Sequence, residues 1–169
     1  MSGDTLRAIN KIGAPSLNLR GLLAGVSAAA LMAMSAGAAH AADWRGLTSS
    51  DWTDGSNWSG GVVPGAGTTV NISTIGAPGF TPVVLGVTGP VNVTVGSTQI
   101  GQNATVPAVL TIQNGSTLTS TGQARTGVTA GATGIITVTG PGSAWNTLGT
   151  QLAIGFLGTA TLNIEMADE

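Results

Sequence analysis

The sequence of 169 residues predicts an all-β fold, and more narrowly a β-solenoid whose coils of about 26 residues stack on one another. Residues that favour helices are scarce, since lysine occurs once and glutamate twice beside 27 glycines. Short runs of β-branched residues alternate with clusters of turn-forming residues. Two separate markers also recur at nearly the same spacing, which is typical of a repeat architecture.

The expected strands are short runs rich in valine, isoleucine, leucine and threonine. They cover residues 70–72, 91–95, 109–112, 135–138 and 162–164. Glycine, asparagine, proline and serine bound each of them, and this is the pattern of strands separated by turns. Disorder is the alternative for so much Gly, Ser and Thr, but 42% hydrophobic residues and a mean hydropathy of +0.36 argue against it.

The repeat length comes from two markers that follow each other along the chain. Leu110, Ile136 and Leu162 begin similar Leu/Ile-x-Ile/Val triplets and are separated by 26 residues each. A residue followed by glycine precedes each triplet: Ile100-Gly101, Thr126-Gly127 and Ile154-Gly155. A period in the twenties without helix-forming sequence indicates a solenoid in which each coil pairs in parallel with the next.

Stacked coils would place equivalent side chains above one another and so form ladders. Successive strand residues face opposite ways, so two ladders should point inward. These inward ladders are Leu110, Ile136 and Leu162, and Ile112, Val138 and Ile164. Thr111, Thr137 and Asn163 should then face solvent. An antiparallel β-sandwich is the alternative architecture; it explains the turns but not the period.

Glycines between the strands are expected at the corners of the coils, in conformations with positive φ. They are Gly115, Gly122, Gly127, Gly131, Gly134, Gly140 and Gly142. Asn114-Gly115 is the strongest turn dipeptide of the chain.

The first 41 residues have the organisation of a secretory signal peptide, expected to be helical. Basic residues lie at Arg7, Lys11 and Arg20, an apolar run follows at 21–34, and Ala39-His40-Ala41 provides an A-x-A cleavage site. Cleavage would fall between Ala41 and Ala42. A transmembrane helix over residues 21–39 is the alternative. It is less favoured because the second half is rich in Ala, Gly and Ser and no basic cluster follows.

The expected mature chain divides into three parts. Residues 42–90 form a tryptophan-rich cap with the first irregular coils, residues 91–164 form the solenoid repeats, and residues 165–169 form a tail. Trp44, Trp52 and Trp58 fall at the start. Their preferred interpretation is a cap, because an opening coil has no neighbour to cover one end of its core. The alternative is a platform on which sugar rings stack, as in a carbohydrate-binding module.

Several motifs together resemble the passenger repeats of bacterial autotransporters, which use type V secretion. They are Asn57-Trp58-Ser-Gly-Gly-Val-Val-Pro64, Leu110-Thr-Ile-Gln-Asn-Gly-Ser-Thr-Leu118, Gly140-Pro-Gly-Ser-Ala-Trp145-Asn-Thr147 and Leu152-Ala-Ile-Gly155. The resemblance extends from about Trp44 to Ile164, and the same repeats occur in some exported proteins with a C-terminal sorting signal. It implies a right-handed β-helix displayed on, or released from, the surface of a Gram-negative bacterium.

The end of the chain departs from that family. A passenger is followed by an outer-membrane barrel, whereas this sequence stops in mid-repeat at Glu165-Met-Ala-Asp-Glu169. The product is therefore expected to be a truncated passenger without a translocator barrel, and such a product would be periplasmic if it is not carried across the outer membrane.

Catalytic chemistry is not expected from the mature sequence. No carboxylate lies between Gly55 and Ile164, and the only histidine, His40, lies in the signal. Paired carboxylates for glycoside hydrolysis, nucleophilic triads and histidine metal sites are therefore lacking. Asp51 and Asp54 suit calcium in principle, but their spacing is more typical of turns. We expect no catalytic residue, no metal and no cofactor.

Charge and cysteine content restrict the partners. Five Lys and Arg residues against seven Asp and Glu residues do not supply the basic surface that nucleic acid requires. Without cysteine, no disulfide framework can form. The prediction is a non-enzymatic exported surface protein with a structural or adhesive role and no membrane span after cleavage. Its expected partners are a host or abiotic surface, a glycan, or a second copy bound at the C-terminal edge. A polysaccharide-acting enzyme is the less favoured alternative.

Overall fold

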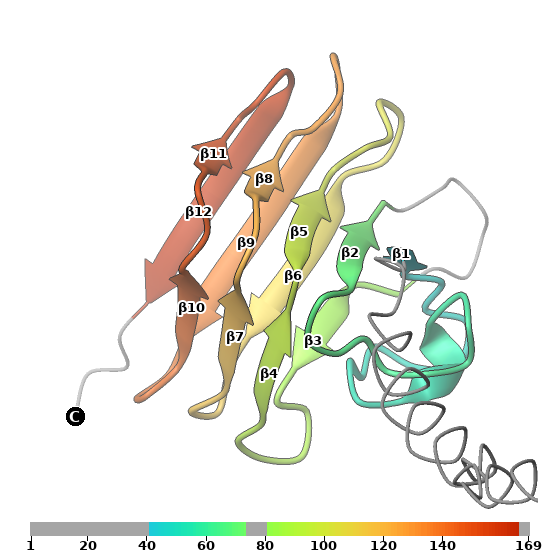
Figure 1. Ribbon diagram of the computed structural model, residues 1–169, viewed down its shortest axis with the longest axis vertical. Coiled ribbons are helices and arrows are strands. Elements are labelled where there is room, and N and C mark those ends of the chain that lie inside the picture. Colours follow the sequence, from blue (N-terminus) through green and yellow to red (C-terminus); the bar gives the residue numbers. More distant parts are fainter. Residues whose placement is uncertain (1–40, 74–80, 166–169) are drawn as a thin grey trace, which may run out of the picture. The chain divides into compact units, whose positions relative to one another are not determined.

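The computed structural model describes residues 41–73 and 81–165, which form an all-β parallel solenoid (Figure 1). All nine strand pairs are parallel, so the predicted solenoid is confirmed and the antiparallel sandwich is wrong. The expected signal helix and its membrane-spanning alternative lie outside the described residues. Within residues 41–73 and 81–165, no helix has the length and apolar character needed to cross a membrane.

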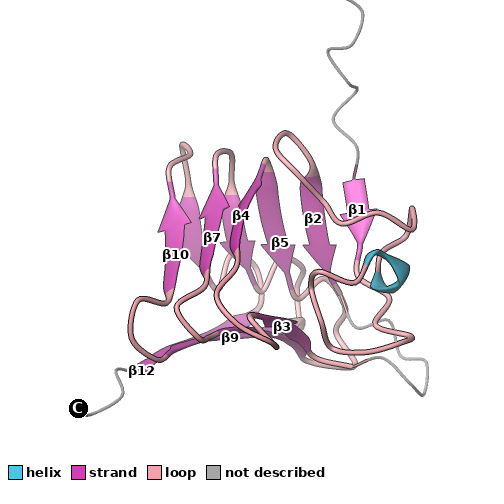
Figure 2. Ribbon diagram, turned by 90° about the horizontal axis from the view of Figure 1, so that it is seen from below, coloured by secondary structure: helices cyan, strands magenta, loops and turns pink. Residues whose placement is uncertain are grey.

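Three sheets form the sides of the coil, with the four-stranded sheet as a base from which the other two rise (Figure 2). The five-stranded sheet contains β1 (Ala41–Asp43), β2 (Thr69–Ile72), β5 (Ser97–Ile100), β8 (Ala124–Thr126) and β11 (Leu152–Ile154). The four-stranded sheet contains β3 (Val83–Leu85), β6 (Ala108–Ile112), β9 (Thr133–Thr139) and β12 (Thr159–Glu165). The three-stranded sheet contains β4 (Asn92–Val95), β7 (Thr117–Ser120) and β10 (Ala144–Thr147).

The period found in the sequence is the register of the four-stranded sheet. Leu110 pairs with Ile136, and Ile136 with Leu162, each 26 residues further along the chain. The residues before the marker glycines are also in register, since Ile100, Thr126 and Ile154 pair across β5, β8 and β11. The two markers therefore belong to two different sides of the same coils.

Regular pairing begins before residue 91. β2 pairs with β5, and β3 pairs with β6, so the coil that contains β2, β3 and β4 belongs to the same sheets as the later repeats. On its other side this coil is covered by β1 and by residues 44–58. That covering segment contains the only helical turn of the described residues, the 3-10 helix η2 (Gly55–Asn57).

The solenoid core is a column of aliphatic side chains that loses its cover toward the C-terminal end. Leu110, Ile136 and Ile112 are fully buried, and Val138 is nearly so. Leu162 is half-buried, and Ile164 is 70% exposed although its backbone pairs with Val138. Because no coil follows β12 in the described structure, its inward side chains lack a neighbour on that side.

Two of the glycines expected to have positive φ do not have it. Gly115, Gly127, Gly131, Gly140 and Gly142 are left-handed as predicted, and Asn114 joins Gly115 with a φ of 56°. The prediction for Gly122 and Gly134 was wrong. A Cβ on Gly122 would come within 2.9 Å of the Gly96 carbonyl oxygen, and one on Gly134 within 2.9 Å of the Ile100 carbonyl oxygen. These positions require glycine because adjacent backbones approach closely, not because of their dihedral angles.

Candidate functional site

The three tryptophans at the start of the expected mature chain form one buried cluster. Trp44, Trp52 and Trp58 are at most 2% exposed. The Trp44 and Trp52 rings each meet Trp58 edge to face, with ring centres 4.9 and 4.8 Å apart. This cluster is continuous with the aliphatic core through Val70, Ile72 and the other buried side chains. The sequence therefore places its largest apolar side chains where the first coil has no preceding neighbour.

Two of the three indole nitrogens donate hydrogen bonds. Trp44 Nε1 donates to the Thr81 carbonyl oxygen, and Trp58 Nε1 donates to that of Trp52, both at 2.8 Å. Trp52 Nε1 is buried without a partner. A sugar ring stacks on an exposed indole face, and the faces of these three residues are covered in the structure. The cluster is thus arranged as the closed end of a core.

A buried amide organises the loop that carries the tryptophans. Asn57 Oδ1 accepts hydrogen bonds from the Thr48 and Ser49 backbone N–H groups, both at 3.1 Å. Its Nδ2 donates to Ser49 Oγ at 2.9 Å and to the Asp51 carbonyl oxygen at 3.0 Å. The Asn57 carbonyl oxygen also accepts from Arg45 N at 2.7 Å. One side chain therefore fixes the path of the chain between Trp44 and Trp58.

Asp51 and Asp54 each close a turn within this loop. Asp51 Oδ1 accepts from Thr53 N and from Thr53 Oγ1, both at 2.8 Å. Asp54 Oδ1 accepts from Ser56 Oγ at 2.6 Å and from Ser56 N at 3.0 Å, which caps η2. These hydrogen bonds, first that of the Ser56 hydroxyl, lower the pKa of Asp54. The described residues contain no group of three or more His, Cys, Asp or Glu side chains arranged to hold a metal ion.

The same loop also completes the edge of a sheet. Trp52 N donates to the Val84 carbonyl oxygen at 3.0 Å, and Val84 N donates to that of Ser50 at 2.8 Å. A short parallel bridge between Asp51 and Val84 results, so residues 50–52 occupy the free side of β3. The free side of β2 is occupied by β1, in which Ala41 pairs with Thr69 and Ala42 with Val70. The expected cleavage site, between Ala41 and Ala42, therefore lies inside β1.

A row of polar side chains runs along the outer face of the five-stranded sheet. We name it the polar row: Asp43, Asn71, Gln99, Gln102, Arg125 and Gln151. Four members stand in register on neighbouring strands, since Asp43 pairs with Asn71, Asn71 with Gln99 and Gln99 with Arg125. Equivalent residues on adjacent strands lie about 4.8 Å apart. The row is thus a regular array of amide, carboxylate and guanidinium groups.

Hydrogen bonds connect the polar row from coil to coil. Asn71 Nδ2 donates to Asp43 Oδ1 at 2.8 Å. Gln102 Nε2 donates to Asn71 Oδ1 at 3.0 Å and to Gln99 Oε1 at 2.8 Å. Because each side chain is held by its neighbour, the row presents its remaining donors and acceptors in fixed positions.

Arg125 ends the polar row with a partly engaged guanidinium group. Its Nε donates to Gln151 Oε1 at 2.7 Å, and its central carbon lies 4.3 Å from the ring centre of Phe156. This distance is within the range of a cation–π contact. Among the described residues, no side chain or carbonyl bonds its two terminal nitrogens. Arg125 therefore offers two oriented donors on a half-buried, immobilised side chain.

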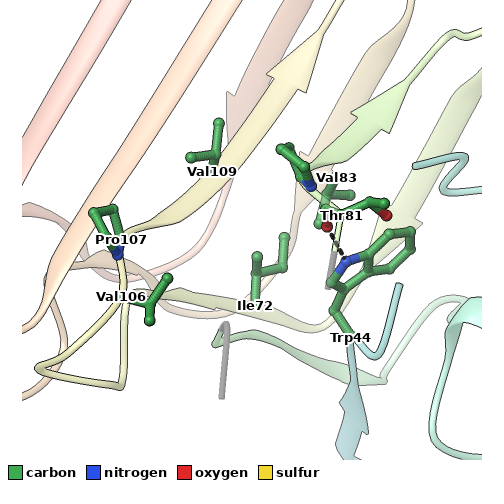
Figure 3. Close-up of a pocket in the computed structure, with 8 residues that line it drawn as sticks. Trp44, Ile72, Thr81, Val83, Val106, Pro107 and Val109 are labelled. Carbon is green, nitrogen blue, oxygen red and sulfur yellow. Dashed lines mark hydrogen bonds between the residues drawn. The ribbon is translucent and has the colours of Figure 1, made fainter. Parts of the chain in front are cut away.

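An apolar hollow of about 160 Å³ opens beside the capped end (Figure 3). It is lined by Trp44, Ile72, Thr81, Pro82, Val83, Val106, Pro107 and Val109. Thr81 has the only side-chain hydroxyl among these residues, and it donates to the Ser49 carbonyl oxygen at 2.6 Å. The hollow has no charged side chain in its lining, so it lacks the polar groups that would orient a ligand.

Sequence reasoning identified the tryptophans and the two aspartates but missed Asn57 and the polar row. A signal for Asn57 exists, since an asparagine between turn residues and a buried tryptophan is placed to bond the backbone of its own loop. The polar row has no equally local signal. Asn71, Gln99 and Arg125 become neighbours only through the pairing of strands 26 to 28 residues apart in sequence.

Comparison with known proteins finds no matching family, no matching curated protein and no matching solved structure. The resemblance to autotransporter passengers therefore remains a prediction that rests on the motifs given above.

Proposed function

We propose that this chain is an exported, non-enzymatic surface module whose solenoid presents the polar row for adhesion. The polar row carries this proposal, because it is the longest chemically uniform feature on the outer surface of the solenoid. It extends over four in-register strands, from Asp43 on β1 to Arg125 on β8. Adhesion to a polymer or a mineral surface uses many weak, regularly spaced contacts, and a row of this kind supplies them.

The chemistry of the row favours a hydroxyl-rich or weakly anionic surface. Amide groups donate and accept hydrogen bonds, so asparagine and glutamine can bind hydroxyl groups in either sense. Arg125 adds two terminal donors that fit a carboxylate in the plane of its guanidinium group. Phe156 holds this group from one face. Polysaccharides, including uronic acid polymers, offer both kinds of partner.

Adhesion can be measured by adsorbing the purified chain to immobilised polysaccharides and to silica. The Gln99→Ala/Arg125→Ala variant should bind at least about tenfold more weakly, because two strands of the row lose their side chains. Thr137→Ala is the matched control, since Thr137 occupies the outer face of the four-stranded sheet. Equal loss of binding in both variants, or no binding by the wild type, would refute adhesion through the polar row.

The non-enzymatic part of the proposal has its own test. The same polysaccharides are incubated with the chain, and released sugar is measured. Turnover that disappears on changing Asp51 or Asp54 would overturn the proposal in favour of an enzyme. The hydrogen bonds of these carboxylates to Thr53 and Ser56 support a role in holding turns instead.

Export and the passenger-like placement are part of the same proposal. A fusion of residues 1–41 to a reporter enzyme that is active only outside the cytoplasm should be active and cleaved after Ala41. Substituting Ala39 and Ala41 with bulky residues should abolish cleavage, because the A-x-A site requires small side chains. An inactive fusion would refute export through this segment.

A further inference from the structure

The two ends of the solenoid differ, and only the N-terminal end is covered. Residues 50–52 occupy the free side of β3, β1 occupies that of β2, and the tryptophans close the core. At the other end, β10, β11 and β12 each have a neighbour on one side only within the described structure. Figure 1 shows these three strands together at the end of the stack.

Exposed apolar side chains gather at this uncovered end. Among the described residues, six of the ten large hydrophobic side chains that are exposed fall within residues 148–164. They are Leu148, Leu152, Ile154, Phe156, Leu157 and Ile164. Leu152 and Ile154 occupy inward positions, because their partners Ala124 and Thr126 are fully buried in the preceding coil. The patch is therefore a core surface in search of another layer.

The backbone of β12 shows which groups face outward from the sheet. Thr159 N donates to the Ala132 carbonyl oxygen at 2.8 Å, and Gly140 N donates to that of Glu165 at 3.2 Å, so residues 159 and 165 bond the preceding coil. Backbone polar groups alternate along a strand. Ala160, Leu162 and Ile164 therefore direct their N–H and C=O groups to the free edge, and their side chains point inward.

From these observations we propose that the uncovered end binds the same end of a second copy, in a closed dimer with two-fold symmetry. Head-to-tail stacking is disfavoured because it would press the uncovered end of one copy against the tryptophan-capped end of the next. A two-fold axis through Leu162 makes β12 antiparallel to its counterpart, because the axis reverses the direction of the strand. Such an interface is self-complementary and closes on itself.

The antiparallel register centred on Leu162 suits the residues of β12. The strand runs from Thr159 to Glu165, so this register pairs its whole length. Leu162 meets its own counterpart, and the bulky Ile164 meets the small Ala160. All three belong to the set with free N–H and C=O groups, so their pairs form hydrogen-bonded rings.

Charge placement also suits this arrangement. Each Glu165 lies opposite Thr159 of the other copy, so the two Glu165 positions are six residues, or about 20 Å, apart along the strands. That separation exceeds the screening length of about 8 Å at physiological salt. The two carboxylates therefore do not oppose pairing.

Molar mass measured by light scattering on the purified chain tests the dimer. The wild type should have the mass of two chains. Ile164→Glu should weaken association at least about tenfold, because it places a charge in the apolar centre of the interface. Val62→Glu is the matched control, since Val62 and Ile164 are both 70% exposed, and it should remain a dimer. A monomeric wild type, or assemblies that grow beyond two chains, would overturn the proposal.

Disulfide formation tests the register, because the chain has no cysteine of its own. Thr161 opposes Asn163 of the other copy in a pair without hydrogen bonds, at a Cα separation of about 4.5 Å. A mixture of Thr161→Cys and Asn163→Cys chains should therefore crosslink on mild oxidation. Either variant alone should not, because identical positions are about 7–8 Å apart on the diagonal. Equal crosslinking in all three samples would refute the register.

Discussion

Gly149 lies so close to Gly122 that a Cβ atom on Gly149 would overlap the carbonyl oxygen of Gly122. Gly122 has the same relationship to Gly96, and Gly122 N donates to the Gly96 carbonyl oxygen at 2.5 Å. The three glycines follow the strands of the three-stranded sheet and precede those of the five-stranded sheet. At this corner, adjacent coils are in backbone contact.

Gly149→Ala should therefore destabilise the fold by about 1–3 kcal/mol, because the added methyl group forces neighbouring coils apart. The measurement is the free energy of unfolding in urea. Gly60→Ala is the control, since nothing lies within 4 Å of a Cβ at that position and its φ is not positive. Equal stability of the two variants would show that the corner can relax.

Ile136 is the central residue of a ladder, between Leu110 and Leu162. Ile136→Ala should cost about 2–5 kcal/mol, because a fully buried side chain is removed from between two coils. Leu162→Ala should cost less, since Leu162 is only half-buried. Thr137→Ala, on the outer face of the same strand, is the control. A larger effect at Thr137 than at Ile136 would reverse the inward and outward assignment.

The period of the four-stranded sheet was predictable because its coils have a constant length and bury similar residues. The same was not true of the other two sheets. Thr69 pairs with Ser97 after 28 residues and Thr98 with Ala124 after 26, while Asn92 pairs with Thr117 after 25. These differences hide β5, β7, β8, β10 and β11 from a search for a fixed spacing. Turns of variable length absorb the differences while the sheets remain in register.

The tryptophan cluster was predictable as a cap, but its internal arrangement was not. Large apolar side chains at the first coil indicate a covered core end. The position of Asn57 at the centre of four hydrogen bonds, by contrast, depends on how the loop folds back on itself. Local sequence does not encode such a path, because several turns of different geometry are compatible with the same serines, aspartates and glycines.

Asn57→Ala should destabilise the chain by roughly 1–3 kcal/mol, because buried polar groups of the loop lose their partner. Far-UV circular dichroism during urea unfolding measures the change. Asn146→Ala is the matched control, since Asn146 is exposed on β10 and its side chain bonds no described residue. If both variants unfolded at the same urea concentration as the wild type, Asn57 would not organise the loop.

Trp52 and Trp58 provide a comparison of two buried indoles that differ in hydrogen bonding. Trp58→Phe removes the donor to the Trp52 carbonyl oxygen, whereas Trp52→Phe removes a buried N–H group that has no partner. Trp58→Phe should therefore be the more destabilising substitution, by about 1 kcal/mol. Unfolding should be followed by circular dichroism, because both variants change the tryptophan fluorescence. The opposite order would mean that Trp52 Nε1 has a partner in solution.

Asp54 predicts how the capped end responds to acid. The hydrogen bonds from the Ser56 hydroxyl and backbone N–H lower the pKa of Asp54 relative to the unfolded chain, where it is about 3.9. A lowered pKa stabilises the fold above the unfolded value, and this stabilisation is lost as the pH falls through the folded value. Asp54→Asn should therefore lose less stability than the wild type between about pH 5 and pH 2. Ser56→Ala should lie between the two, because it removes the hydroxyl but keeps the backbone donor. Parallel pH profiles for all three proteins would show that these hydrogen bonds do not persist in solution.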